Sequence, residues 1–390
     1  MKRVILVGFI GLFWSATMVA QTVKTGILVV GNGNSALGAG IQAAKSGVNT
    51  VILMTEPGFK ISPDQIITSG LQREFLSVLS AKNPNQSQQL NGNDLLKLWT
   101  DSIKNLTIIK AGIWTKFKRS GSGWGVELKD GKTIKAKVLV DADLSGKLTE
   151  ALQFPSQSAF WQPLDYTTNV YRTSIAAGRG ANPEILSLYK FLNPLQDNLV
   201  SLDPKDQRFV IGQAAGATAA YAAFFDRKTS QSNLKNIQGE LVNFKLSLIP
   251  FEDVIELDSN WKAVQFVGLS GILKADVKEG KAFFNPEAKV SALEIKQPFK
   301  DFFYKAQIWF DDHKEEQISI GSALDLICYT GGKKLETTKA EVIKNWKKLY
   351  KFNSDFDEKR IITRREFSVL LHSYNNPFNV NVDVTGRVSR

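Results

Sequence analysis

The sequence predicts an α/β fold in which a parallel sheet, interrupted by an antiparallel β-meander, is followed by a mainly helical C-terminal domain. Three segments indicate this fold: the run "GILVVGNGNSALGAGIQAAKSGVNTVILMTE", the β-rich run that ends in "KVLVDAD", and the small-residue stretch "RFVIGQAAGATAAYAAFF". A chain of 390 residues, 43% of them hydrophobic, is long enough for two or three domains.

The N-terminus has the pattern of a secretory signal peptide. Lys2 and Arg3 precede the apolar run "VILVGFIGLFW", and Ala20 offers a small residue for cleavage. Because that run is short for a membrane span, we expect residues 1–20 to be removed, which leaves an exported, periplasmic or secreted protein without a transmembrane span. A retained anchor stays an alternative, since Met18 is larger than the residue usually found two positions before the cut.

Glycines after the first apolar run predict a tight strand-to-helix turn. "GILVV" is uniformly apolar, as expected of a parallel strand buried on both faces. In the pattern Gly31-x-Gly33-x-x-Ala36, the first glycine permits the turn and the second leaves room for a pyrophosphate, while Ala36 lets the helix pack closely on the strand. The alternative is a turn of this shape that binds nothing.

A second buried strand and an acid complete a dinucleotide-binding pattern. The helix "SALGAGIQAAKSG" is expected to end at Gly47, and "NTVILMTE" is the second strand. Glu56 lies 23 residues after Gly33, where an acid accepts hydrogen bonds from both ribose hydroxyls and disfavours the 2′-phosphate of NADP. The predicted cofactor contacts in this segment are Gly31, Gly33, Asn34, Ala36 and Glu56.

The elements that follow favour FAD over NAD. Three β-rich runs follow one another, and the third ends in the apolar strand "KVLVDAD". Asp130-Gly131, between the second and the third run, is a hairpin signal. An NAD-type domain would continue with alternating strands and helices, so an NAD-linked dehydrogenase is the weaker alternative.

Over residues 25–275 the chain resembles the FAD-dependent oxidoreductases of the secreted bacterial type, which belong to the FAD/NAD(P)-binding Rossmann superfamily. The glycine motif, Asp141-Ala142 in "VLVDADLSGKL" and residues 212–216 carry the resemblance. It implies a FAD-binding Rossmann-like sheet, FAD as the cofactor, and hydride transfer from an organic substrate to the flavin. The further cofactor contacts that it implies are Asp141, Ala142, Gly212, Ala215 and Gly216.

The third of these segments also has a physical interpretation. "QAAGATAAYAAFF" is expected to form a helix of small residues, whose N-terminal amides and dipole favour a phosphate or a flavin carbonyl. The alternative is an alanine-rich helix that packs tightly on the sheet.

The chain departs from the family pattern at several places. Asp143 replaces a threonine and Lys147 replaces an acid. The Gly-Gly segment that usually follows the ribose-binding acid is reduced to Gly58 and Gly70, and the substrate region spans only about residues 149–208. No catalytic residue is assigned from the sequence.

Other candidate groups are few. Arg172 and Arg179, in a segment that alternates like a strand, could meet an anionic substrate or the flavin, but surface or hinge roles are preferred. The single cysteine, Cys328, excludes an intramolecular disulfide and is expected to be a buried, inert thiol. His313 and His372 have no second ligand at a metal-binding spacing, and no metal site is predicted.

The C-terminal third contains a cryptic repeat with a spacing of 72 residues, from Phe284 to Phe356. Each copy carries a capping box, Ser291 with Glu294 and Thr363 with Glu366. Thr338 and Glu341 form a third box of the same kind. The aromatics at helical spacing, Trp309, Trp346 and Tyr350, are expected to be core residues.

The segment "ITRREF" in this region is similar to S-layer-homology motifs, which form helical repeats and often bind cell-wall polysaccharide. Cell-envelope polysaccharide is therefore a predicted partner of the C-terminal region. The preferred alternative is a helical domain that only packs on the flavin domain.

These interpretations combine into one functional prediction and one alternative. The chain is expected to be an exported FAD-dependent oxidoreductase that acts on an unidentified small molecule; the alternative is a non-catalytic relative that serves as a binding or scaffold protein at the cell envelope. The net charge of +11 comes from lysines interspersed with acids, so no nucleic-acid partner is predicted. The predicted parts are a signal peptide (1–20), a FAD-binding domain (24–230), a helical connection (231–275) and a helical C-terminal domain (276–390).

Overall fold

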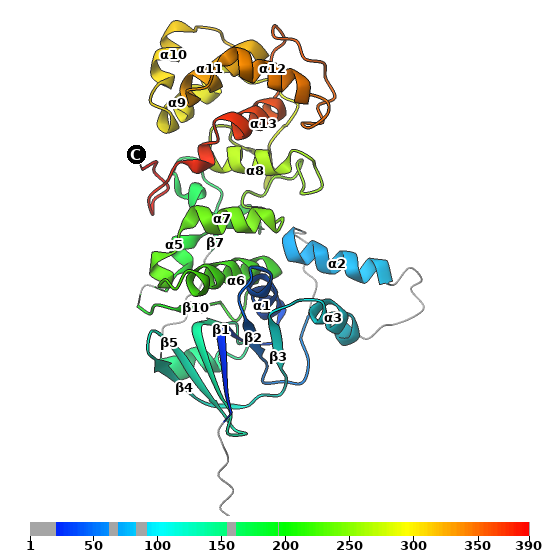
Figure 1. Ribbon diagram of the computed structural model, residues 1–390, viewed down its shortest axis with the longest axis vertical. Helices are drawn as coiled ribbons and strands as arrows, with labels where there is room; N and C mark the ends of the chain where they lie inside the picture. The colour runs from blue at the N-terminus through cyan, green and yellow to red at the C-terminus, as the bar shows by residue number, and fades with distance from the viewer. Residues whose placement is uncertain (1–20, 62–68, 83–91, 154–160, 194, 390) are drawn as a thin grey trace, which may run out of the picture.

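The structure is a computed structural model that describes residues 21–61, 69–82, 92–153, 161–193 and 195–389. The predicted signal peptide lies outside the described residues. The elements form an elongated stack, with a β-sheet at one end, a layer of helices in the middle and a cluster of helices at the other end (Figure 1). Within the described ranges, no helix is both long and apolar enough to cross a bilayer.

The large sheet has seven strands in the order β3-β2-β1-β6-β5-β4, with β10 paired to β6. Strands β3, β2, β1, β6 and β10 are parallel, and β6, β5 and β4 form an antiparallel meander. The strands are β1 (Thr22–Val30), β2 (Thr50–Leu53), β3 (Leu106–Ile109), β4 (Trp114–Ser120), β5 (Gly123–Leu128), β6 (Thr133–Asp141) and β10 (Leu199–Ser201). This topology confirms the predicted fold class, a Rossmann-like parallel sheet with a β-meander insertion.

Strand β1 is apolar throughout its second half because both of its faces are covered. Ile27 and Val29 pack with residues of the helical layer, whereas Leu28 and Val30 pack with residues of β5 and of the short helix α4 (Lys147–Leu152). All four side chains are buried, so a polar residue at any of these positions would lose its hydration without gaining a partner.

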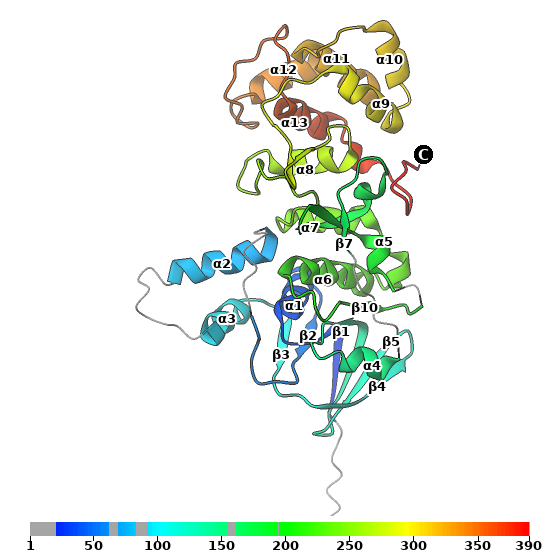
Figure 2. The same cartoon turned by 180° about the vertical axis from the view of Figure 1, so that it is seen from behind.

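The helical layer on the sheet is built around α1 (Asn34–Lys45) and α6 (Phe209–Phe224). The two helices are in backbone contact, which requires glycine at two positions of α6. A Cβ added at Gly212 would overlap the carbonyl oxygen of Ser35, and one added at Gly216 would overlap that of Ala39. Helix α6 begins at Phe209, so the prediction that residues 212–216 form its start was wrong by one turn. Helices α2 (Gly70–Lys82) and α3 (Gly92–Asp101) lie beside this layer (Figure 2).

A small second sheet, with strand order β7-β9-β8, fills the region between β6 and α6 in the chain. Its strands are β7 (Trp161–Pro163), β8 (Ser174–Arg179) and β9 (Pro183–Ser187), and α5 (Leu188–Phe191) follows. The segment expected to start as a strand is instead the 3-10 helix η1 (Val170–Thr173). Next come η2 (Thr229–Gln231), α7 (Leu234–Asn243), α8 (Trp261–Ser270) and the hairpin of β11 (Asp276–Lys278) and β12 (Lys281–Phe283).

The C-terminal helices are arranged around a closed ring of three backbone hydrogen bonds. The Val290 amide donates to the Ile362 carbonyl, Ile362 donates to Ile318, and Ile318 donates back to Val290, at 3.0–3.1 Å. All three side chains are fully buried. The elements are α9 (Ala292–Phe302), α10 (Ala306–Asp312), α11 (Ile320–Gly331), α12 (Leu335–Asn345), α13 (Arg364–Tyr374) and η3 (Pro377–Asn379).

Each position of this ring is followed by a hydroxyl that caps a helix. Ser291, Ser319 and Thr363 accept hydrogen bonds from the third amide of α9, α11 and α13. The third repeat is therefore at Ser319, and the predicted box at Thr338 was wrong, because Thr338 is buried within α12. Its sequence signal was hidden by Ser322, which occupies the position where the other two copies have glutamate.

The expected core residues of this region are confirmed. Trp309, Trp346 and Tyr350 are each at most 5% exposed. Cys328 is a buried free thiol, and burial raises its pKa, as expected of an inert cysteine.

Candidate dinucleotide-binding site

The carboxyl ends of the central strands meet at one level of the sheet. Val30 at the end of β1 pairs with Leu53 of β2 on one side and with Asp141 of β6 on the other. Loops that leave parallel strands at a common level converge, and ligands of open α/β sheets bind at this edge. The residues that follow these three strands therefore form the candidate site.

Gly31 begins the turn from β1 to α1, and its conformation requires glycine. Its φ is 143°, in the region that side chains disfavour, and an added Cβ would overlap the carbonyl oxygen of Ala142. Ala36, fully buried in the first turn of α1, lies close to the same point. The turn of residues 31–36, here called the glycine turn, thus has the close strand–helix approach that the sequence predicted.

Gly33 is the N-cap of α1 and is covered by a side chain from another part of the chain. It has no side chain to cap the helix, so the first amides of α1 lack the usual hydroxyl or carboxylate acceptor at this position. A Cβ added to Gly33 would overlap Oε1 of Gln207. That oxygen accepts a hydrogen bond from Ser35 Oγ at 3.0 Å, and Gln207 Nε2 donates to the Pro204 carbonyl at 3.1 Å.

The remainder of the glycine turn is also covered by protein atoms. Asn32 and Asn34 are 6% and 3% exposed, and Ser35 is fully buried. The amide of Lys60 donates to the Asn32 carbonyl at 2.7 Å, and Gly33 forms a parallel bridge with Lys60. In this conformation the segment after β2 therefore lies against the turn.

Glu56 lies beside the turn, at the position expected for a ribose-binding acid. Its carboxylate accepts hydrogen bonds from Asn32 Nδ2 at 3.3 Å and from Lys60 Nζ at 2.9 Å. The side chain is 48% exposed, so the ion pair with Lys60 is solvated and contributes little to stability. A ligand hydroxyl could exchange with either donor at small cost.

Asp141 is the buried carboxylate at the end of β6. It accepts hydrogen bonds from Thr149 Oγ1 at 2.7 Å and from the amide of Asp143 at 3.1 Å. Burial raises the pKa of Asp141 from 3.8 to about 6, since these two donors only partly replace water. Asp143, the residue that departs from the family threonine, accepts from the amides of Ser145 and Leu148 and so stabilises the start of α4.

Substitution of Asp141 by asparagine is expected to stabilise the protein at neutral pH. A folded-state pKa of about 6 means that folding favours the protonated carboxyl, so stability is fully present below pH 4 and falls as the pH rises through 6. A shift of about two units corresponds to at most about 3 kcal/mol. Urea unfolding of Asp141→Asn and wild type from pH 4 to 8 should show a difference that grows up to about pH 6 and is then constant.

The matched control is the exposed Asp165, whose pKa is lowered by hydrogen bonds from the Thr167 hydroxyl and amide. Asp165→Asn should slightly lower the free energy of unfolding at neutral pH, which is the opposite sign. Equal stability of Asp141→Asn and wild type at every pH would contradict the burial argument.

The predicted cofactor contacts on α6 are packed against another helix, unlike the predicted contacts at the strand ends. Gly212, Ala215 and Gly216 are within the helix and are buried, and both glycines contact the backbone of α1. The structure thus brings together Gly31, Gly33, Glu56, Asp141 and Ala142 at the strand ends, whereas the three residues of α6 pack between helices. A cofactor role for all of these residues stays a prediction.

A polar cluster that was not predicted from the sequence lies in front of α6. Trp161 Nε1 and Arg208 Nη2 both donate to Asp206, at 2.5 and 2.6 Å, and the Arg208 guanidinium lies 4.1 Å from the centre of the Trp161 ring. Burial opposes ionisation of Asp206, but these hydrogen bonds outweigh it and leave its pKa lowered. The cluster fixes the backbone on both sides of Gln207.

Arg172 and Arg179 are both held by groups of the protein, and Arg172 is buried, so the expectation of a surface arginine was wrong for Arg172. Arg172 is buried and donates to the carbonyls of Ser270 and Gly386, at 2.8 and 3.3 Å. Arg179 forms an ion pair with Glu252. Among the residues that the structure describes, no group of three or more His, Cys, Asp or Glu side chains could hold a metal ion.

Comparisons with known proteins give only distant similarities. No family model matches the sequence, and no curated protein matches it significantly. Similar solved structures include p-nitrophenol 4-monooxygenase PnpA from Pseudomonas putida DLL-E4 (10% identity, TM-score 0.30, 57% of this chain and 84% of that one). Others are a flavoprotein/dehydrogenase from Cytophaga hutchinsonii (16%, 0.25, 35% and 44%) and L-proline dehydrogenase from P. horikoshii (11%, 0.22, 32% and 23%). The chain spans less than half the length of the last two.

Proposed function

We propose that the chain is a FAD-binding flavoprotein of the oxidoreductase class. The observation that carries this proposal is the glycine turn between β1 and α1, with an acid, Glu56, in hydrogen-bond contact with Asn32 of that turn. Gly31 is required by backbone conformation, whereas the second glycine, Gly33, has no side chain at the point where a pyrophosphate would approach the backbone. The inserted meander and the parallel β10 agree with a FAD-type sheet.

The residues present fit such a cofactor if the Gln207 side chain moves away from Gly33 and the segment of Lys60, which also lies against the turn, makes room. The amides at the start of α1 would bind the pyrophosphate, and Glu56 would accept hydrogen bonds from the ribose in exchange for Asn32 and Lys60. Gln207 Oε1 lies against Gly33 and cannot remain there together with a pyrophosphate. This atom is the far end of a flexible, partly exposed side chain, so the position can be vacated without a change in the backbone.

When bound, FAD would accept a hydride from an organic substrate. The chain's own contribution would be binding and orientation. Helix α1 and Glu56 would hold the dinucleotide, and the sheet of β7, β8 and β9 comes from residues 149–208, where the sequence predicts the substrate region. We also propose that the protein acts outside the cytoplasm, supported by the basic and apolar pattern of residues 1–20.

A protein expressed as residues 21–390 is expected to bind FAD. Supplied with FAD during refolding or purification, it should show flavin absorption and release one equivalent of FAD on denaturation. Glu56→Ala should fold normally, because this side chain is half-exposed, but bind FAD about tenfold more weakly through loss of the ribose contacts. A colourless protein that takes up no added FAD would contradict the proposal.

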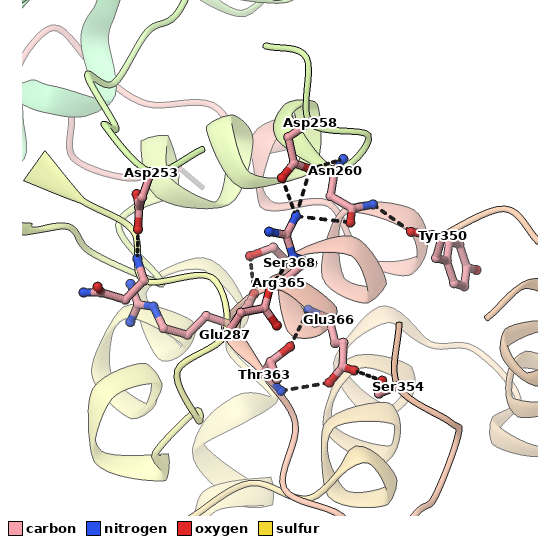
Figure 3. A network of polar contacts seen from close by, with 12 residues as sticks. Asp253, Asp258, Asn260, Glu287, Tyr350, Ser354, Thr363, Arg365, Glu366 and Ser368 are labelled. Carbon is pink, nitrogen blue, oxygen red and sulfur yellow. Dashed lines mark hydrogen bonds and ion pairs between the residues drawn. The ribbon is translucent and has the colours of Figure 1, made fainter. Parts of the chain in front are cut away.

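A second candidate function is a non-catalytic binding protein of the cell envelope. The covered glycine turn favours it, as does a polar cavity of about 640 Å³ in the C-terminal region. Arg365 lines this cavity and donates to both carboxylate oxygens of Asp258, at 2.6 and 2.8 Å, and to Glu287 at 2.7 Å (Figure 3). A colourless protein that sediments with insoluble cell-wall polysaccharide would support this candidate.

A further inference from the structure

We propose that Gln207 is an internal occupant of the pyrophosphate position and controls access of the cofactor to the glycine turn. This inference rests on the proposed function and deepens it, because it names the residue that sets the affinity of the site. Its basis is the overlap between Gln207 Oε1 and the open side of Gly33, together with the hydrogen bond from Ser35.

The position of the amide oxygen has a clear electrostatic reason. The start of α1 carries the positive end of the helix dipole, its N-cap residue Gly33 offers no side-chain acceptor, and α1 has no acidic residue in its first turn. A carbonyl oxygen carries a partial negative charge, and a phosphate oxygen carries a larger negative charge. Gln207 Oε1 therefore occupies the place where a dinucleotide phosphate would gain most.

The backbone around Gln207 is fixed, so on this side of the turn only the Gln207 side chain can move away from Gly33. Asp206 is held by Trp161 and Arg208, and its amide donates to the Asp203 carbonyl at 2.9 Å. Arg208 is the N-cap of α6. Rotation of the Gln207 side chain breaks its hydrogen bonds with Ser35 and Pro204 and leaves the rest of the segment in place.

This competition predicts a measurable effect of the side chain on affinity. A cofactor must displace two hydrogen bonds of Gln207 before it binds, and the loss of two such bonds corresponds to roughly tenfold in affinity or more. Gln207→Ala removes the occupant and should strengthen binding by about that factor. Gln207→Glu keeps the size of the side chain but places a carboxylate there, which should weaken the binding of any phosphate.

The experiment compares wild type, Gln207→Ala, Gln207→Glu and the control Lys205→Ala, an exposed residue of the same segment. FAD and ADP are titrated into each protein, with flavin fluorescence for FAD and calorimetry for ADP. The expected order of affinity is Gln207→Ala, then wild type together with Lys205→Ala, then Gln207→Glu. Equal FAD affinity of wild type and Gln207→Ala would overturn this inference and leave the proposed function intact.

A second measurement needs no ligand. Amide hydrogen exchange at residues 33–36 should be faster in Gln207→Ala than in Lys205→Ala, because the cover of the turn is lost. Unchanged exchange would overturn the role of Gln207 whatever the outcome of the titrations. Faster exchange in a set of proteins that all fail to bind FAD and ADP would support Gln207 as the cover and refute the FAD proposal.

Discussion

Gly212→Ala is expected to destabilise the protein by about 3 kcal/mol, although it adds a single methyl group. The added Cβ would overlap the carbonyl oxygen, the Cα and the carbonyl carbon of Ser35, which are backbone atoms of the first turn of α1. Neither helix can yield locally, because both are fully buried against the sheet at this point. Overpacking of this kind costs about 1–3 kcal/mol and sometimes more.

The control is a glycine-to-alanine change on a neighbouring helix. Gly239 lies within α7, and an added Cβ there would meet only the Phe378 ring, at 3.8–3.9 Å, which is ordinary van der Waals contact. Gly239→Ala should therefore stabilise the protein by up to about 1 kcal/mol through helix propensity. Chemical denaturation of both variants measures the difference, and a neutral Gly212→Ala would show that α1 and α6 are not in close contact.

Glu366→Ala is expected to destabilise the C-terminal region by about 3–5 kcal/mol. The carboxylate is 3% exposed and accepts hydrogen bonds from the amide of Thr363 and the hydroxyl of Ser354 (Figure 3). It also accepts hydrogen bonds from two nitrogens of Arg360. Its removal leaves the Arg360 charge and the Thr363 amide without their partner in a poorly solvated place.

The effect of Glu366→Ala should depend on pH. Burial alone would raise the pKa of Glu366, but the hydrogen bonds from Arg360 and Ser354 outweigh it and lower the pKa. The stabilisation is therefore present above the unfolded-state pKa of about 4.3 and is lost as the pH falls through the folded-state value. Glu287→Ala, at a side chain that is 71% exposed, is the control and should change stability little. Equal unfolding curves for the two variants at pH 7 would contradict the argument.

The strands and turns near the N-terminus could be predicted because their determinants are local. A uniformly apolar stretch such as residues 27–30 requires burial on both faces, and Gly31 is required by its own backbone angle. The hairpin at Asp130-Gly131 likewise follows from the positive φ of Gly131. These features depend on a few consecutive residues, which the sequence displays directly.

The cover of the glycine turn could not be predicted because it joins distant parts of the chain. Nothing in "DPKDQR" indicates that the side chain of Gln207 returns to Gly33, since glutamine is an ordinary surface residue in such a segment. The same limit applies to the glycines of α6. A small residue is needed equally for a helix contact and for a phosphate, and only the position of Ser35 shows that Gly212 makes a helix contact.

The ring formed by Val290, Ile318 and Ile362 has a consequence for how the C-terminal region melts and evolves. In an open-ended array each unit touches only its neighbours, so units can be added or deleted one at a time. A closed circle of three has no terminal unit, and the loss of any one leaves two unpaired backbone edges inside an apolar centre. This part of the molecule should therefore unfold in a single all-or-none step and should accept insertions between its three segments, but not a change in their number.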